Sequence, residues 1–153
     1  MAGLVTEKDI INKLAEQVAE IEGIQNAYPF AENPASMQDS MMPAVVFYPR
    51  RSRHQRKGHH NVWTNTIEIR GLLFVTKRMT AAGDIKIIEN RALIFPQRFR
   101  QKFQTDSVIR DLLNLGVQKA DFVECSYGSG GPLTYMGTEY IGFVLEWEFG
   151  ETR

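Results

Sequence analysis

Few side chains in this sequence could carry chemistry, and the first is a single cysteine. Cys125 stands between Glu124 and Ser126 in a segment whose pattern predicts a strand. A catalytic thiol needs a helix N-terminus or a basic neighbour to lower its pKa, and the flanking residues supply neither. We therefore expect Cys125 to be a structural strand residue. One cysteine also excludes an intrachain disulfide, which favours synthesis in a reducing compartment.

Three histidines lie close together at positions 54, 59 and 60, a spacing that could suggest a metal site. The surrounding segment, residues 50–61, contains no Asp, Glu or Cys to complete such a site. The same segment shows no apolar period and is predicted to be a loop, which places the usual general base outside the folded body. We expect no metal, no cofactor and no enzymatic activity.

Two further patterns imitate catalytic motifs. The glycine-rich run 128–131 leads into Pro132 and a strand, whereas phosphate-binding loops lead into a helix N-terminus. We therefore expect a hairpin turn there. Glu146 and Glu148 would share one face of a strand, about 6–7 Å apart. Without a companion acid or base, they indicate a solvated or subunit-facing surface instead of an acid–base pair.

The strongest chemical signal is the charge of residues 50–61. This segment holds five positive side chains and no acid, while the other 141 residues sum to −5. We expect a basic loop insertion on a mildly acidic body. Such a loop suits a negative partner, either nucleic acid or an acidic protein surface; the alternative is a solvated loop with no specific partner. Its positive residues are Arg50, Arg51, Arg53, Arg56 and Lys57.

The composition bounds the kind of chain that must position these residues. The chain has 153 residues, of which 43% are hydrophobic and 24% charged, and its formal net charge is zero. These values are typical of one globular domain spanning residues 1–153, and they exclude collagen-like, coiled-coil and disordered classes. The sequence contains no apolar run near the ~20 residues of a membrane span, and its start predicts no secretory signal.

The first half of the chain is predicted to form a helix and three strands. Apolar residues at helical spacing predict a helix over 7–22, capped by Thr6 and Asp9 and ended by Gly23. Strands follow at 24–28, at 44–48 and, after the basic loop, at 62–77, with a loop over 31–42. Because the last two strands flank the basic loop, we expect them to pair antiparallel as a long hairpin.

The second half is predicted to contain a helical region and two strands. Residues 80–103 have helical spacing, and Pro96 predicts a kink or two abutting helices near residue 95. A short helix capped by Asp106 or Ser107 is expected to follow, and then strands at 117–127 and 133–149. The predicted fold class is α+β: a mostly antiparallel sheet with an N-terminal helix and a central helical region packed on one face.

The order of these elements, together with the chain length, resembles the phage tail terminator (tail-completion) proteins. The matching features run through most of the chain, and no single one is specific. They are the helix at 7–22, Ala27-Tyr28-Pro29, the Met-Pro-Ala strand start at 42–46, the aromatic-rich helix at 85–103 and the Tyr-x-Gly pairs at 135–137 and 140–142.

This resemblance implies a structural role in the virion. Such proteins form a ring, commonly a hexamer, on the last ring of the tail tube. They end tube polymerisation and offer an interface to the head-side connector, and DNA passes through the ring without sequence-specific binding. The resemblance implies no catalytic residue, no cofactor and no membrane partner. It also implies a protein made in the host cytoplasm and located in the tail or neck of the virion.

The charge pattern gives that role a candidate subunit interface. We expect the positive residues of 50–57 to meet an acidic tube face or acids of a neighbouring copy, namely Glu146, Glu148 and Glu151. Two alternatives stay open: another neck or head-completion component, and a nucleic-acid-binding module acting through the basic loop. Against the latter, the loop has no aromatic residue for base stacking and the body is net acidic.

Overall fold

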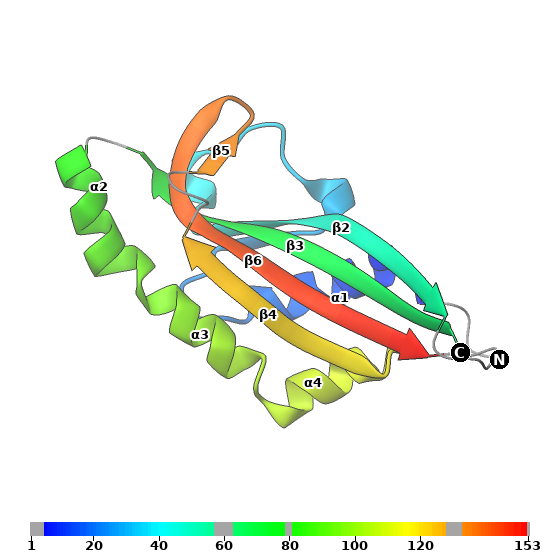
Figure 1. Ribbon diagram of the computed structural model, residues 1–153. Coiled ribbons are helices and arrows are strands. Elements are labelled where there is room, and N and C mark those ends of the chain that lie inside the picture. The colour runs from blue at the N-terminus through cyan, green and yellow to red at the C-terminus, as the bar shows by residue number, and fades with distance from the viewer. Residues whose placement is uncertain (1–4, 57–62, 79–80, 128–132, 153) are drawn as a thin grey trace.

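A twisted sheet runs the length of the molecule, and Figure 1 views its open face. In the computed structural model, which describes residues 5–56, 63–78, 81–127 and 133–152, the strand order is β1-β2-β3-β6-β4, with β5 paired to β6. The β1–β2 pair is parallel and the other pairs are antiparallel. The strands are β1 Asn26–Tyr28, β2 Ala44–Arg56, β3 Trp63–Lys77, β4 Lys119–Tyr127, β5 Leu133–Tyr135 and β6 Thr138–Thr152.

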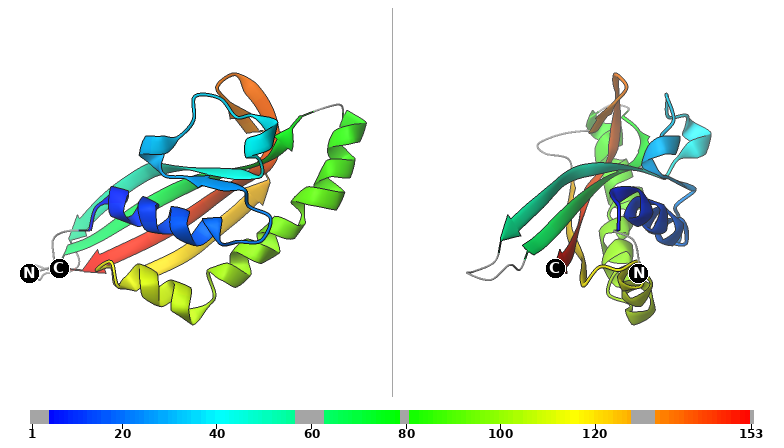
Figure 2. Two further views of the ribbon diagram at one scale, coloured as in Figure 1. Left: turned by 180° about the vertical axis from the view of Figure 1, so that it is seen from behind. Right: turned by 90° about the vertical axis from the view of Figure 1, so that its right-hand side faces the viewer.

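The helices gather on the other face of this sheet, so the fold is the predicted α+β class. Figure 2 shows α1 lying across the strands, with α3 and α4 beside it. The segment α2 projects past the end of β4 (Figure 1). The helices are α1 Glu7–Ala19, α2 Ala81–Ile87, the π-helical turn η3 Ile88–Ala92, α3 Ile94–Lys102 and α4 Asp106–Leu113. Two single 3-10 turns, η1 Phe30–Glu32 and η2 Asp39–Met41, interrupt the loop after β1.

The N-terminal helix begins where its sequence signals lie but ends at Ala19, with Glu20 as its C-cap, before the predicted end at residue 22. The hydroxyl of Thr6 accepts a hydrogen bond from the Asp9 backbone N–H at 3.3 Å, and the Asp9 carboxylate accepts one from the Thr6 N–H at 3.3 Å. This reciprocal pair is a capping box, as predicted. After α1, Gly23 adopts a φ of +93°, which only glycine reaches without strain. The buried stripe of α1 includes Ile10, Leu14 and Val18.

The central helical region breaks before Pro96 instead of at it. The Leu93 N–H donates to the Ile88 carbonyl at 3.1 Å, a π-helical bond spanning five residues. Because Pro96 has no N–H, it cannot satisfy the carbonyl four residues earlier, and the helix widens just ahead of it. The next helix, α4, has Thr105 as its N-cap residue, so the predicted caps Asp106 and Ser107 were wrong. The Thr105 hydroxyl bonds back to the Gln101 carbonyl at 2.9 Å.

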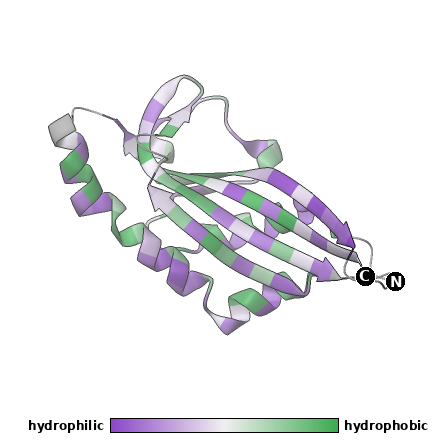
Figure 3. Ribbon diagram, viewed as in Figure 1, coloured by the Kyte–Doolittle hydropathy of each residue, from purple (hydrophilic) through white to green (hydrophobic). Residues whose placement is uncertain are grey.

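The prediction of a basic loop at 50–61 was wrong for residues 50–56. Strand β2 continues through Pro49 to Arg56, pairing Arg51 with Glu68 and Arg56 with Trp63 at the two ends of the added stretch. A bulge lies between Pro49 and Arg51. Figure 3 shows this end of β2 as hydrophilic. It lacks the apolar alternation by which a strand is recognised, because its side chains are exposed on both faces. Residues 57–62 lie outside the described part of the chain.

The predicted strand 133–149 is two strands. A two-residue turn at Met136 and Gly137, with φ values of +49° and +82°, joins β5 to β6. Positive φ at both positions is the geometry of a tight hairpin turn. Strand β6 then runs on to Thr152. The turn predicted at 128–131 lies outside the described residues.

The main core lies between the sheet and the helices, and β6 supplies its centre. Alternate residues of β6 face the helices, and each is at most 3% exposed: Ile141, Phe143, Leu145, Trp147 and Phe149. The Trp147 ring lies 5.3–6.5 Å from four aromatic rings, those of Phe47, Phe99, Phe103 and Phe122. A smaller cluster covers one end of the opposite face and contains Met37, Met42, Phe74, Tyr135 and Tyr140.

Candidate functional site

The rest of the face opposite the helices carries charged side chains, and we define it as the charged face. Its strands alternate, so the neighbours of buried core residues point to this side. Arginines come from β2 and β3, and carboxylates come mainly from β6 and β4. The residues are Arg50, Arg51, Arg53, Glu68, Arg70, Lys119, Asp121, Glu124, Glu146 and Glu148.

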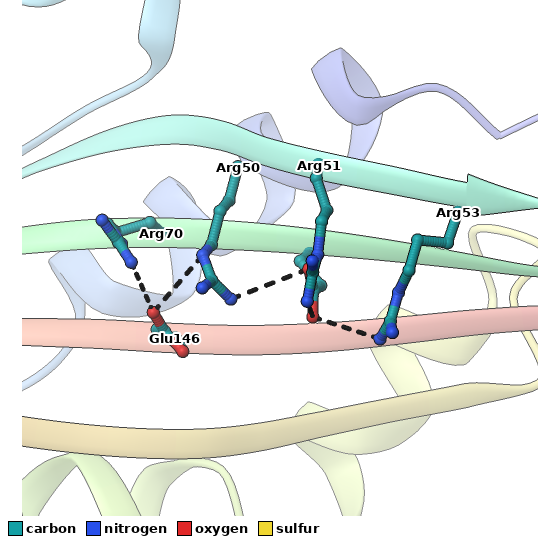
Figure 4. Close-up of polar contacts among 6 residues, drawn as sticks. Arg50, Arg51, Arg53, Arg70 and Glu146 are labelled. Carbon is teal, nitrogen blue, oxygen red and sulfur yellow. Dashed lines mark hydrogen bonds and ion pairs between the residues drawn. The ribbon is translucent and has the colours of Figure 1, made fainter.

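Glu68 is the centre of the arginine side of this face, where Figure 4 shows Arg50, Arg51 and Arg53 side by side. Its side chain is only 10% exposed, and Arg51 donates to it through Nε and, at 3.5 Å, through Nη2. Arg53 Nη2 lies 3.4 Å from Glu68 Oε1, and Arg50 Nη1 lies 3.7 Å from Glu68 Oε2. The hydrogen bond from Arg51 lowers the pKa of Glu68, so the carboxylate stays ionised among three guanidinium groups.

Glu146 holds two arginines at the middle of the face. Arg70 Nη2 donates to Glu146 Oε1 at 2.9 Å, and Arg50 Nε lies 3.7 Å from the same oxygen. Arg50 therefore bridges Glu68 and Glu146, as Figure 4 shows for its Glu146 side. Arg50 is the additional residue of the bulge in β2, and a bulge re-aims a side chain in this way.

The β4 side of the charged face is acidic. The strand register sets Asp121 opposite Glu148 and Glu124 opposite Glu146. Lys119 Nζ lies 3.4 Å from Asp121 Oδ2 and 3.6 Å from Glu148 Oε1. Glu124 forms no ion pair within 4 Å with any described residue. Like charges placed directly opposite each other are destabilising, so this register leaves an unbalanced negative edge.

Formal charges divide the face into two halves. On β2 and β3, four arginines and Glu68 sum to +3. On β6 and β4, four carboxylates and Lys119 sum to −3. We call these the arginine half and the acidic half. The opposite charges lie at opposite edges of one sheet.

The structure brings together some of the predicted interface residues and separates others. Arg50, Arg51 and Arg53 share the charged face with Glu146 and Glu148, and Arg50 already pairs with Glu146 inside one chain. The remaining predicted residues lie elsewhere: Arg56 is opposite Trp63, Glu151 accepts a hydrogen bond from Asn65 at 3.3 Å on the helix side of the sheet, and Lys57 lies outside the described residues.

One predicted histidine belongs to the folded sheet, contrary to expectation. His54 lies in β2, stacks on Trp63 with ring centroids 4.4 Å apart, and contacts the side-chain oxygen of Asn65 through Nδ1. An aromatic residue therefore does stand beside the basic segment. His59 and His60 lie outside the described residues. Within the described ranges, no three His, Cys, Asp or Glu side chains are grouped to hold a metal ion.

Cys125 lies half-buried in β4, beside the main core. Burial raises the pKa of its thiol from 9.0 to about 11, and the charge of Arg100 only partly offsets this. The thiol is therefore protonated near neutral pH and is a poor nucleophile. Its environment agrees with the structural role predicted from its neighbours.

Sequence analysis missed Glu68, Arg70, Asp121 and Glu124 as members of this face. The alternation of Glu68 and Arg70 with buried isoleucines placed them on a polar face, but gave them no partner. Asp121 and Glu124 flank the bulge at Val123, which breaks a simple period-two count. Only the register shows that both acids stand opposite the glutamates of β6.

A second surface is apolar and lies toward the β4 side of the molecule. Exposed large hydrophobic residues occur along the helical segment 81–102 and on β4. They are Ile85, Leu93, Ile94, Val123 and Tyr127.

No family model matches this chain, and a search of curated proteins also finds no match. Within the described ranges, no helix is both long enough and apolar enough to cross a membrane.

Proposed function

We propose that this chain is a structural protein of the phage virion that assembles into a closed ring, commonly a hexamer, on the end of the tail tube. The ring ends tube polymerisation, presents an interface to the head-side connector, and leaves a channel through which DNA passes. The α+β fold and the order of its elements, on which the resemblance to tail terminators depends, support this proposal.

One observation carries the self-assembly part of the proposal. Among the described residues, β4 pairs only with β6, which leaves its nine-residue outer edge open. Val123 is 55% exposed on this strand and Tyr127 is 40% exposed. Proteins that stay monomeric usually cover or charge such edges, whereas assemblies use them. An open edge with apolar side chains is therefore suited to a contact with another polypeptide.

The exposed helical residues support a second contact, with the tail tube. Leu93 is 57% exposed and Ile94 is 43% exposed at the junction of the π-helical turn and α3. This helical segment runs beside β4 and continues past its end as α2 (Figure 1), and the exposure of Leu93 and Ile94 makes both side chains accessible to a partner. Burial of both against a partner would contribute about 3 kcal/mol or more. We assign this segment to the tube or connector face.

A tube-capping assay tests this function. Purified tail-tube protein of the same phage is polymerised with and without the chain, and tube lengths are measured by electron microscopy. The wild-type chain is expected to shorten the tubes and to appear at one end. Leu93→Glu with Ile94→Glu should abolish this effect, while the control pair Lys86→Gln with Glu89→Gln on the same helical segment should retain it. Unchanged tube lengths at equimolar wild-type chain would contradict the proposal.

Nucleic-acid binding is the second candidate, favoured by the excess of arginine around Glu68. Three arginines on one carboxylate leave uncompensated positive charge that suits phosphate groups. A gel-shift titration with duplex and single-stranded DNA at low salt tests it. Binding that weakens steeply with salt, and weakens further in Arg51→Gln with Arg53→Gln, would favour this candidate. Absence of a shift at micromolar protein would exclude an independent binder.

A neck or head-completion role differs from the proposed role only in the position of the protein in the particle. Labelling of the chain in intact particles would reveal that position.

A further inference from the structure

We infer that the free edge of β2 in one copy pairs with the edge of β4 in the next, so that the sheet continues from subunit to subunit. This inference rests on the proposed ring and names the surface that closes it. The occupant of each edge is a second copy of this chain. Its recognition combines backbone pairing with the opposite charges of the two halves of the charged face.

The two edges are of matching length. Strand β1 pairs with β2 only at Ala44–Val46, and the Asn33 side chain binds the Phe47 carbonyl at 3.1 Å. Beyond this point, the edge of β2 that faces away from β3, at residues 48–56, has no strand beside it in the described part of the chain. Strand β4 presents nine residues, Lys119–Tyr127, at the other edge. Both edges carry a bulge, at Pro49–Arg51 and at Phe122–Glu124. Regular pairing would therefore centre on residues 51–56 of β2 and on one of the two regular stretches of β4, residues 119–122 or 124–127.

The strand directions allow a head-to-tail repeat. Strand β2 is antiparallel to β3, β3 to β6, and β6 to β4, so β4 runs opposite to β2 within one chain. A rotation about an axis roughly along the strands preserves these directions from copy to copy. The β4 strand of one subunit then lies antiparallel to the β2 strand of the next. Such heterologous contacts close into a ring when the rotation divides a full turn.

Charge selects this arrangement over a two-fold dimer. Two β4 edges brought together would set Asp121 and Glu124 against the same acids, and two β2 edges would set arginine against arginine. Pairing β2 with β4 instead places the arginine half beside the acidic half, with neighbouring strands about 4.8 Å apart. Opposite charges on adjacent strands stabilise pairing and like charges oppose it. The pattern therefore favours one edge-to-edge contact and disfavours the other two.

The charges that would meet are incompletely neutralised within the chain. Arg51 and Arg53 have side chains 52% and 53% exposed, and both share the single carboxylate of Glu68. Glu124 forms no ion pair within 4 Å with a described residue. A neighbour's edge would supply the missing counter-charges without breaking the bonds to Glu68.

Paired charge reversals test this inference by sedimentation velocity at low salt. Asp121→Lys with Glu124→Lys changes the acidic half from −3 to +1, so that both edges are basic, and Arg53→Glu with Gln55→Glu removes the excess positive charge of the arginine half, changing it from +3 to 0. Each variant alone is expected to weaken self-association at least tenfold. An equimolar mixture, and one chain carrying all four changes, should each restore it, because the introduced lysines then face the introduced glutamates across the contact. Thermal melting checks that every variant is folded.

The control is Glu16→Lys with Glu89→Lys, which makes the same change in net charge as Asp121→Lys with Glu124→Lys but away from both edges, and should assemble normally. If the wild-type chain assembles and the single reversals assemble equally well, another surface holds the ring, and the inference is wrong while the proposed function survives. A wild-type chain that stays monomeric at millimolar concentration also overturns edge pairing. The tube-capping assay then decides the proposed function independently.

Hydrogen exchange gives a second readout that a general charge effect would not produce. Assembly through the two edges should slow exchange at backbone amides of 51–56 and 119–127. Protection confined to the helical segment 81–102 would overturn the inference.

Discussion

The two faces of strands β3 and β6 differ in what they do, although their residues alternate along the same backbone. Toward the helices, Trp147 is 1% exposed and packs among four aromatic rings. Its neighbours Glu146 and Glu148 point to the other side and meet arginine and lysine side chains at or near the surface. A buried tryptophan removes 150–250 Å² from water, whereas exposed ion pairs contribute about 0–1 kcal/mol each. The helix side therefore stabilises the fold, and the charged face is available for association.

The largest expected effect is the loss of the aromatic centre of the core. Trp147→Ala should lower the free energy of unfolding by about 4 kcal/mol, because a large cavity would remain between the sheet and α3. Trp63→Ala is the matched control, since Trp63 is 37% exposed and lies at the end of β3. We expect it to change stability by less than about 1 kcal/mol. Equal losses in urea unfolding would remove the distinction between the two positions.

The second prediction tests whether the side of the sheet that faces the helices is still shielded from water at β4. Burial raises the pKa of Cys125 from 9.0 to about 11, so the thiolate is scarce in the folded chain. Alkylation by iodoacetamide near neutral pH should be about 100-fold slower in the native chain than in the urea-unfolded chain. Native reactivity equal to that of the unfolded chain would show that the core ends before β4.

The third prediction concerns Glu68, whose side chain is only 10% exposed although it lies on the charged face. Glu68→Gln should destabilise the fold by about 2 kcal/mol near neutral pH, because three arginines lose their shared carboxylate. The folded pKa of Glu68 lies below the ordinary value of 4.5. Its contribution is therefore fully present above that value and disappears as the pH falls through the folded pKa.

Thermal unfolding from pH 7 to pH 2 checks this dependence. The stability difference between wild type and Glu68→Gln should shrink below about pH 4.5. Glu124→Gln is the control, since Glu124 makes no ion pair within 4 Å with a described residue, and it should be nearly neutral. A difference that stays constant with pH would mean that packing, and not charge, accounts for the role of Glu68.

The smallest effect on stability should come with a large effect on assembly. Arg53→Gln removes one of three arginines from Glu68 and exposes no buried group, so the free energy of unfolding should change by at most about 0.5 kcal/mol. Self-association should nevertheless weaken and lose part of its salt dependence. A stability loss as large as that of Glu68→Gln would assign Arg53 to the fold instead of the interface.

The start of α1 and its buried stripe could be predicted well because their signals are local. The capping box of Thr6 and Asp9, the positive φ of Gly23 and the buried stripe of α1 all lie within a few turns of one helix. The alternation along β6 was equally clear, since one face meets the core over its whole length. In each case a single periodicity reports burial directly.

The strand at 50–56 could not be predicted in the same way. Its residues are exposed on both sides, so no apolar alternation distinguishes it from a loop. It is held by backbone pairing with β3 and by the bonds of Arg51 and Arg53 to Glu68. Strand β3 has fifteen residues and needs a pairing partner of similar length. This length was the one available signal for a strand at 50–56. The turn at Met136 was missed because a methionine there gives no indication of a positive φ.

By itself the sequence determined the α+β class, the start of α1 at its capping box, and which side of β6 enters the core. Only the tertiary structure decided that β6 lies between β3 and β4, and hence that Asp121 and Glu124 stand beside the acids of β6. Periodicity reports the burial of each residue, which is a local property. The neighbour of a strand, and therefore the charge at each edge of the sheet, depends on contacts between segments far apart in the chain.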